Sequence, residues 1–351
     1  MKLPKPGPIS KFSPTLINHL AACGFRAAFS QDPNFNDLKK AGTSQMLGLI
    51  RHDLSAKIAT GAINNVDISR IKEAIGDLWD SIAESYAVAL AEEWFPNTPP
   101  DLETWKDYHT RRIRAIKDLT QQVETFRESD SNGYKPPTIE RRLDDPATGL
   151  YGYPDRVEHR FEGIILVDLK NANETTIKSE WHRQLLLYAH LVRVSEGDTP
   201  VAVVIENGKG ERIRSEITDS DIDGTLNNAL ALVANFNSAL SNLSSLANPD
   251  PETCQYCDFR SVCEPFWQHV VHDWPGNSVR GDIKSVEPSE MGALVIFEPK
   301  QPEDQPQKEL RISPIPIEIS RDISRIVVLD AGSTPNPEIL EPRWYTQVFV
   351  D

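Results

Sequence analysis

The sequence lacks any apolar run that approaches the roughly 18 residues needed to cross a membrane. Residues 1–10 hold two lysines and three prolines but no apolar stretch like that of a signal peptide. A phosphate-binding loop of the G-x-x-x-x-G-K-[ST] kind is also missing, as is any internal repeat. We therefore expect a soluble, cytoplasmic protein with no ATP-driven motor of its own and no membrane partner.

Positive charge is scarce, with 37 Lys and Arg against 52 Asp and Glu and a formal net charge of −15. Phosphate binding usually depends on a basic surface, so any contact with DNA must be a local groove. The helical pattern between residues 67 and 128 contains one basic cluster, formed by Arg111, Arg112, Arg114 and Lys117. The cluster predicts either part of a DNA path or a solvated face interleaved with Asp107 and Asp118.

The length of the chain predicts two units, because a single core stops growing at roughly 250 to 300 residues. We expect the first over residues 1–272, with a helical insertion at about 62–130, and the second over 273–351. Apolar stretches between Pro-, Gly- and Asp-rich turns predict a small OB-like β-barrel for the second unit. Such barrels bind single strands by aromatic stacking, but few aromatic residues such as Trp344 and Tyr345 are available. A docking module or a structural cap is an equal prediction.

The segment Gly152–Lys170 is typical of a β-hairpin with a buried second strand. Strand side chains alternate between two faces, so Asp168 and Lys170 project from the same face, and Asp155 comes from the first strand. Carboxylate oxygens suit Mg²⁺ or Mn²⁺, which take one or two carboxylates together with substrate phosphate. The pattern therefore indicates phosphodiester cleavage. The alternative is a solvated hairpin with a surface ion pair.

Four further polar residues are candidates for this site. Gln184 and Tyr188 lie four residues apart on an expected helix over 178–193, so they share a face that can reach the lysine or a phosphate oxygen. Ordinary helix surface is the alternative. His52, on an expected helix from residue 44 to about 61, is either a metal ligand or a solvated histidine. Glu140 either assists the metal site or pairs with the arginines beside it.

The four cysteines are too few for a disulfide scaffold, and their spacing is informative. Cys254, Cys257 and Cys263 form a C-x2-C-x5-C run that needs a fourth ligand from elsewhere, and Cys23 is the only cysteine left. A zinc site with four cysteine ligands is the chemical rival. Zinc ligands usually come as two pairs, whereas three clustered cysteines plus a distant one suit a four-iron, 4Fe-4S cluster.

These motifs together resemble the PD-(D/E)XK nuclease superfamily, and within it the RecB-like iron-sulfur branch that includes AddB-like and CRISPR-adaptation nucleases. The signature residues are Pro154-Asp155 followed by Asp168-Leu169-Lys170. Supporting matches are Gly-x-x-x-His ending at His52, Gln-x-x-x-Tyr ending at Tyr188, and the cysteine after an opening Ser-Pro-Thr helix. The resemblance covers about residues 9–268 and leaves the C-terminal region unexplained.

The resemblance implies a restriction-endonuclease-like mixed sheet with a helical insertion and an iron-sulfur clip. It further implies a metal site formed by His52, Asp155, Asp168 and the Leu169 carbonyl, with Lys170 positioning or deprotonating the attacking water. The helix residues Gln184 and Tyr188 would assist catalysis.

The implied activity is that of a deoxyribonuclease dependent on magnesium or manganese, acting as an exonuclease on single-stranded ends. Repair, CRISPR adaptation and antiviral (phage) defence are the implied settings, with a helicase or a defence-complex subunit as protein partner and homo-oligomer formation left open. Two alternatives remain: a non-catalytic DNA-binding or assembly subunit, favoured by the acidic composition and the extra barrel, and a redox-responsive cluster protein.

Overall fold

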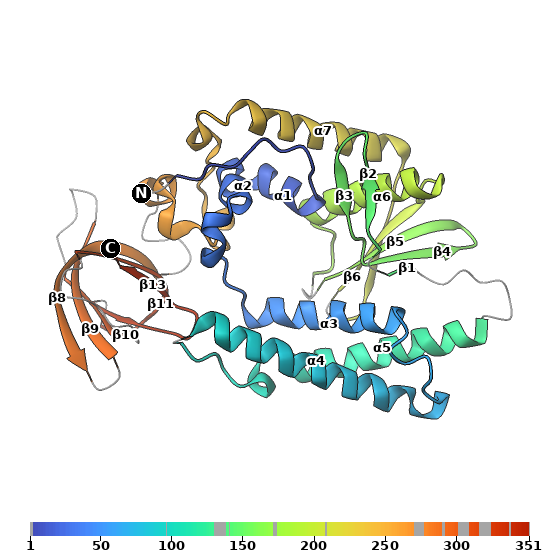
Figure 1. Cartoon of the computed structure of the whole chain (residues 1–351), viewed down its shortest axis with the longest axis horizontal. Coiled ribbons are helices and arrows are strands. Elements are labelled where there is room, and N and C mark those ends of the chain that lie inside the picture. Colours follow the sequence, from blue (N-terminus) through green and yellow to red (C-terminus); the bar gives the residue numbers. More distant parts are fainter. Residues whose placement is uncertain are drawn as a thin grey trace.

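The structure is a computed structural model of the whole chain (Figure 1). It describes residues 3–95, 97–129, 138–139, 141–170, 174–207, 209–269, 277–289, 292–300, 309–315, 324–336 and 338–350. Within these ranges no helix is long and apolar enough to span a membrane.

A mixed five-stranded sheet forms the centre of the larger part of the molecule. Its order is β1-β4-β5-β6-β7, with β5 and β6 parallel and the other neighbours antiparallel. The strands are β1 (Thr138–Ile139), β4 (Arg156–Arg160), β5 (Gly163–Leu169), β6 (Ala202–Glu206) and β7 (Arg212–Glu216). The connection between the parallel pair contains α6 (Ser179–Glu196), because parallel neighbours need a crossover. This sheet matches the mixed α/β core expected from the sequence.

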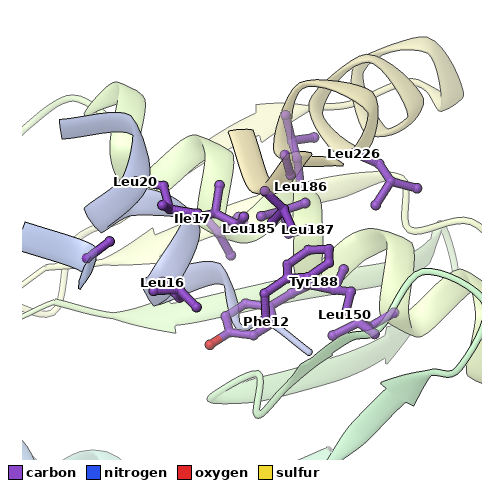
Figure 2. Packing of buried hydrophobic residues seen from close by; sticks show 14 of the residues in the cluster. Phe12, Leu16, Ile17, Leu20, Leu150, Leu185, Leu186, Leu187, Tyr188 and Leu226 are labelled. Carbon is purple, nitrogen blue, oxygen red and sulfur yellow. The ribbon is translucent and has the colours of Figure 1, made fainter. Parts of the chain in front are cut away.

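One face of the sheet carries the main core, and helices cover it (Figure 1). Besides α6 these are α1 (Pro14–Ala22), α2 (Gly24–Gln31) and α7 (Asp219–Ser238). Alternate residues of β5 explain the two faces: Ile164 and Leu166 join the main cluster, whereas Ile165 and Val167 join a small cluster on the other side. Figure 2 shows the part of the main cluster where α1 and α6 meet.

The expected hairpin over residues 152–170 is divided in two. β3 (Leu150–Gly152) pairs with β2 (Leu143–Asp145), and only β4 and β5 form the hairpin that belongs to the central sheet. Pro154 has no N–H to donate to a ladder, which accounts for the break between β3 and β4. Asp155 therefore precedes β4 instead of lying within a strand.

A second helical layer has a core of its own and lies on the other side of the molecule (Figure 1). It consists of α3 (Thr43–Ala59), α4 (Ile71–Trp94) and α5 (Tyr108–Ser129). The fully buried Trp79 packs near Tyr108, with ring centroids 6.4 Å apart. The remaining short helices are η1 (Pro33–Leu38), η2 (Ile68–Arg70), η3 (Leu102–Thr104), η4 (Leu243–Leu246), α8 (Pro251–Cys254), η5 (Arg260–Val262) and α9 (Glu264–His269).

The C-terminal strands close into a five-stranded barrel in the order β8-β9-β10-β12-β11, with β11 pairing back to β8. The only parallel pair among the described strands of the barrel is β10 with β12. These are the third and fifth barrel strands in chain order, and their pairing fits an OB-like fold. β13 adds to β11 at the side. The strands are β8 (Asn277–Ser289), β9 (Gly292–Pro299), β10 (Leu310–Ile315), β11 (Arg325–Ser333), β12 (Ile339–Glu341) and β13 (Gln347–Val350).

The barrel is docked on two other parts of the chain. Trp344 meets Trp94 of α4 edge to face, at 5.5 Å between ring centroids, and the Asn97 amide donates to the Thr346 carbonyl at 3.1 Å. On the other side, the Arg260 guanidinium donates two hydrogen bonds to Asp330, at 2.9 and 2.6 Å. The barrel is thus held against both the helical layer and the segment that carries the clustered cysteines.

Gly149 lies where the N-terminal segment contacts the start of β3, so we expect its substitution to change the stability of the fold. Its φ is +79°, and a Cβ there would lie 2.2 Å from the backbone oxygen of Ser10. Gly149→Ala should therefore lower the free energy of unfolding by about 3 kcal/mol, measured by urea denaturation, because left-handed strain and a backbone collision add together. The matched control is Gly197→Ala, with φ +82° and nothing within 4 Å, which should cost only about 1 kcal/mol. Equal losses would show that the contact with Ser10 is unimportant.

Candidate active site

The end of β5 places Asp168 and Lys170. Asp168 follows the apolar residues of the strand and is only 2% exposed, on the face that carries the main core. Lys170 comes two residues later, and its Nζ lies 2.7 Å from Asp168 Oδ2. The expectation that these two side chains lie on the same side of the strand is confirmed by this contact. The backbone N–H of Lys170 donates to the Glu206 carbonyl of β6 at 2.9 Å, which holds the strand end in place.

Asp155 meets the same strand end from the segment before β4. Its Oδ2 accepts a hydrogen bond from the Leu169 N–H at 2.7 Å. The Leu169 carbonyl and the Lys170 N–H belong to one peptide group, and this N–H points toward the Glu206 carbonyl on β6. In a trans peptide the C=O points away from the side to which the N–H points. The carbonyl therefore points toward the side on which Asp155 lies. Three of the four residues expected to bind a metal, Asp155, Asp168 and Leu169, thus meet at one strand end.

Loss of contact with solvent disfavours the charged form of both carboxylates in the protein without a metal. Desolvation, followed by repulsion from Asp168, raises the pKa of Asp155 to about 7. Desolvation also raises the pKa of Asp168, although the neighbouring Lys170 ammonium opposes the shift. Asp168 is buried and Asp155 is only 13% exposed, so two carboxylates beside one lysine are short of positive charge, which is the electrostatic condition that a divalent cation relieves.

Lys170 is surrounded by groups from α6. Its Nζ donates to Gln184 Oε1 at 3.4 Å, and the Gln184 amide donates to the Tyr188 hydroxyl at 3.4 Å. The Trp181 ring lies 5.8 Å from the ammonium. The Tyr188 ring packs closely on Gly152, where an added Cβ would lie only 2.6 Å from the ring. The expected helix pair Gln184 and Tyr188 therefore lies in a chain of contacts that leads to the lysine.

His52 comes to the site from α3, which belongs to the second helical layer. Its Nδ1 lies 3.7 Å from Asp155 Oδ1, too far for a hydrogen bond but close enough for electrostatic attraction. The side chain is 31% exposed, so the site is open on this side. A histidine more than one hundred residues before the carboxylates has thus been brought beside them. Glu140, the other candidate from the sequence, lies outside the described residues.

The fit of this site to a metal can be tested on its donors. Asp168 Oδ2 is buried and accepts no well-angled hydrogen bond from the described residues, although the Lys170 ammonium is close to it. In the described ranges no three His, Cys, Asp or Glu side chains form a group that could hold a metal ion. A site for Mg²⁺ does not require three, because this ion keeps several waters and takes one or two carboxylates. The donors fit Mg²⁺ or Mn²⁺.

The four cysteines are all free thiols, and all four line one small pocket. Cys23 reaches it from the junction of α1 and α2, and the Asn248 N–H donates to its sulfur at 3.4 Å. Burial raises the pKa of Cys254, that of Cys257 to about 11 and that of Cys263 to about 12. The position of Cys23 beside the clustered three agrees with its choice from the sequence as the fourth member of the set. Among the described residues these thiols do not form a group that could hold a metal ion, so the metal centre expected from the sequence stays a prediction.

A second pocket lies beside the lysine, between the strand end and the helical layer. Its lining includes Lys170, together with Arg51, Arg111 and Arg114 from α3 and α5. The basic cluster expected from the sequence is therefore divided, because Arg112 instead makes two hydrogen bonds to Asp80, at 2.6 and 2.5 Å. Sequence reasoning missed Arg51. Its position one residue before His52 was the available signal.

A family model and a solved structure are similar to this chain. A family model described as the PD-(D/E)XK nuclease superfamily matches residues 11–264, which include every candidate residue from Cys23 to Cys263. No curated protein matches the chain. One similar solved structure is described as a "Putative exonuclease" from Eubacterium rectale, with a TM-score of 0.38, 10% identity, and coverage of 75% of this chain and 89% of that chain. The likeness to that structure is too low to support an argument. The family match spans most of the chain, and the chain belongs to the PD-(D/E)XK nuclease superfamily.

Proposed function

We propose that this protein is a metal-dependent deoxyribonuclease that hydrolyses phosphodiester bonds. The observation that carries the proposal is the buried carboxylate of Asp168 and the largely buried carboxylate of Asp155, which is 13% exposed, beside Lys170 at the end of β5. Asp155, Asp168, His52 and the Leu169 carbonyl would hold Mg²⁺ or Mn²⁺. When bound, such an ion polarises the scissile phosphate and lowers the pKa of a bound water.

The side chains around the carboxylates have separate tasks in this proposal. Lys170 carries a positive charge next to the reacting phosphate, where it orients the attacking water and offsets the negative charge that develops. Gln184 accepts a hydrogen bond from Lys170 and so directs the ammonium, while Tyr188 directs Gln184. These contacts fix the geometry of the lysine before substrate binds, which is how such a site avoids reorganisation during the reaction.

We further propose that the four cysteines bind a 4Fe-4S cluster, with zinc as the rival occupant. The thiols line one pocket, but they do not form a group suited to a single ion among the described residues. In a cluster each iron takes one thiolate, so the sulfurs stand farther apart than around one zinc. The centre would close a loop of about 230 residues between Cys23 and Cys254, which is the case in which a clip restricts the unfolded chain most.

The substrate and setting are proposed from the resemblance found in the sequence. They are the ends of single-stranded DNA, cleaved as an exonuclease in repair, CRISPR adaptation or phage defence, beside a protein partner such as a helicase. The two units proposed are a nuclease unit over 1–272 and the barrel unit over 273–351. The second candidate function is a non-catalytic DNA-binding or assembly subunit, and the net charge of −15 favours the partnership with another protein that such a subunit needs.

Removal of the lysine tests the activity. Lys170→Ala should reduce Mn²⁺-dependent release of label from 5′- and 3′-labelled single-stranded DNA by a factor on the order of 10² to 10⁴, because a positioned charge and proton carrier is lost. The matched control is Lys178→Ala, which removes a lysine near the same Trp181 ring but one paired with Glu174. The control should cleave at the normal rate. DNA binding without cleavage by any form would establish the non-catalytic subunit.

The raised pKa of Asp155 generates a prediction for the metal-free protein. An acid whose folded pKa is raised from 3.8 to about 7 makes the fold lose stability as pH rises through that interval, because the unfolded chain gives up its proton first. Asp155→Asn should therefore unfold at a higher temperature than the wild type at pH 7 to 8. The corresponding gain in the free energy of unfolding is up to about 3 kcal/mol. The difference should vanish at about pH 4.

Metal should reverse this difference. Mn²⁺ should raise the unfolding temperature of the wild type at about pH 8 and much less at about pH 6, because a proton on Asp155 competes with the ion. Asp155→Asn should lose most of the metal-induced shift. The control is Asp144→Asn, which changes an exposed carboxylate paired with Arg142. A wild type whose response to Mn²⁺ equals that of Asp155→Asn would contradict the proposed metal site.

The cysteine site predicts a visible chromophore. Protein purified without oxygen should be brown and contain about four irons and four sulfides per chain. Cys254→Ser should lose the colour and most of the thermal stability, whereas Lys170→Ala should keep both and lose only cleavage. Iron, sulfide and zinc would be measured by elemental and colorimetric analysis. One zinc per chain in colourless, stable protein would overturn the cluster in favour of its rival.

A further inference from the structure

The pocket beside Lys170 contains more positive charge than its own acids balance. Arg51, Arg111 and Arg114 line it from the helical layer, and Lys170 lines it from the sheet. The acidic residues of the lining are Asp118 and Glu206. In a chain with a net charge of −15, four cations around one pocket form a local exception. This concentration is the kind of local groove that an acidic protein needs in order to contact a nucleic acid.

The acids satisfy these arginines only in part. Glu206 is already paired with Arg156 at 2.6 Å, and Asp118 stands 3.7 Å from Arg51. Arg51 Nη1 is buried and has no hydrogen-bond partner within the described ranges. The Arg114 side chain makes no hydrogen bond or ion pair in the part of the chain that the structure describes. A buried guanidinium with an unused N–H is costly unless a ligand completes it.

The remaining arginine is held only weakly. Arg111 has two long contacts to Ser44, at 3.4 Å to its carbonyl and 3.5 Å to its hydroxyl. Desolvation lowers the pKa of both Arg51 and Arg111, so both cations are kept in surroundings that favour an added anion. Guanidinium groups bind phosphate through paired, charge-assisted hydrogen bonds. The lining therefore suits a phosphate group.

We propose that Arg51, Arg111 and Arg114 form a subsite for a backbone phosphate of the DNA strand, next to the phosphate that is cleaved. The inference rests on the proposed nuclease function. Lys170 lines this pocket and also contacts Asp168, so a strand that places one phosphate at the carboxylates has its next phosphates within reach of the arginines. The subsite would hold the strand in register for cleavage, and it would make the helical layer part of the substrate-binding surface.

The first experiment measures binding of a fluorescent single-stranded oligonucleotide by anisotropy, in chelator so that no cleavage occurs. Arg114→Gln should weaken binding about tenfold and reduce the slope of log affinity against log salt by about 0.7, the value for one lost phosphate contact on a single strand. The matched control is Lys117→Gln, which removes the same charge from an exposed position on the same helix that does not line the pocket. The control should leave the slope unchanged.

The second experiment locates the phosphate. Oligonucleotides with one neutral methylphosphonate at each position in turn should bind the wild type less tightly at one or two positions beside the scissile bond. Arg114→Gln should show no further loss at one of those positions, because the contact is already gone. Arg111→Gln provides a second variant for the same cycle. Thermal unfolding of each variant, equal to that of the wild type, would show that the effect is not misfolding.

The outcomes separate this inference from the proposed function. A wild type that cleaves DNA while both arginine variants behave like Lys117→Gln would overturn the subsite and leave the nuclease intact. A wild type that neither binds nor cleaves DNA would overturn the proposed function itself. Losses that are equal at every methylphosphonate position in the wild type and in Arg114→Gln would mean that the arginines act only through general charge, which also overturns the subsite.

Discussion

The arrangement of the site is constrained by two carboxylates that are withdrawn from solvent at the end of β5, with Asp168 buried and Asp155 largely so. Burial of like charges is costly, and the raised pKa values of Asp155 and Asp168 express that cost. The backbone of the strand holds them there, through the Leu169 N–H on Asp155 and the pairing of β5 with β6. The Lys170 ammonium compensates only in part. The fold thus accepts instability at the point where a cation and a phosphate would bind, as functional sites commonly do.

The rest of the site is assembled from elements that surround this strand end. The connection from β5 to β6 contains α6, so Gln184 and Tyr188 are delivered to the lysine by the same chain segment that makes the parallel pair. The helical layer comes from the opposite direction. It brings His52 to Asp155, and neighbouring residues of the same layer line the pocket beside Lys170. The carboxylates therefore lie where the end of the central strand β5 meets two helical layers, each with its own apolar core.

Local periodicity predicted much of this arrangement, and long-range packing limited the rest. Period two on β5 was sufficient to place Asp168 and Lys170 together, and a four-residue spacing was sufficient for Gln184 and Tyr188. No local pattern shows that α3 packs against the strand end, so His52 was identified only through the resemblance, and Arg51 was missed. The basic cluster on α5 looked uniform in sequence. Only the structure shows that Arg112 is neutralised by Asp80 from another helix, whereas its neighbours line the pocket.

The barrel is a second case in which long-range packing could not be predicted from the sequence. Its strand order fits an OB-like module, a fold that binds single strands by aromatic stacking. Trp344, however, packs on Trp94 and lies with Tyr345 against the core of the helical layer, so these two rings are engaged in docking. Leu329 of the barrel packs in one apolar cluster with Cys254 and Phe266, and Arg260 ties that segment to Asp330. These contacts dock the barrel on the segment that carries three of the four cysteines, although no described barrel residue lines the cysteine pocket itself.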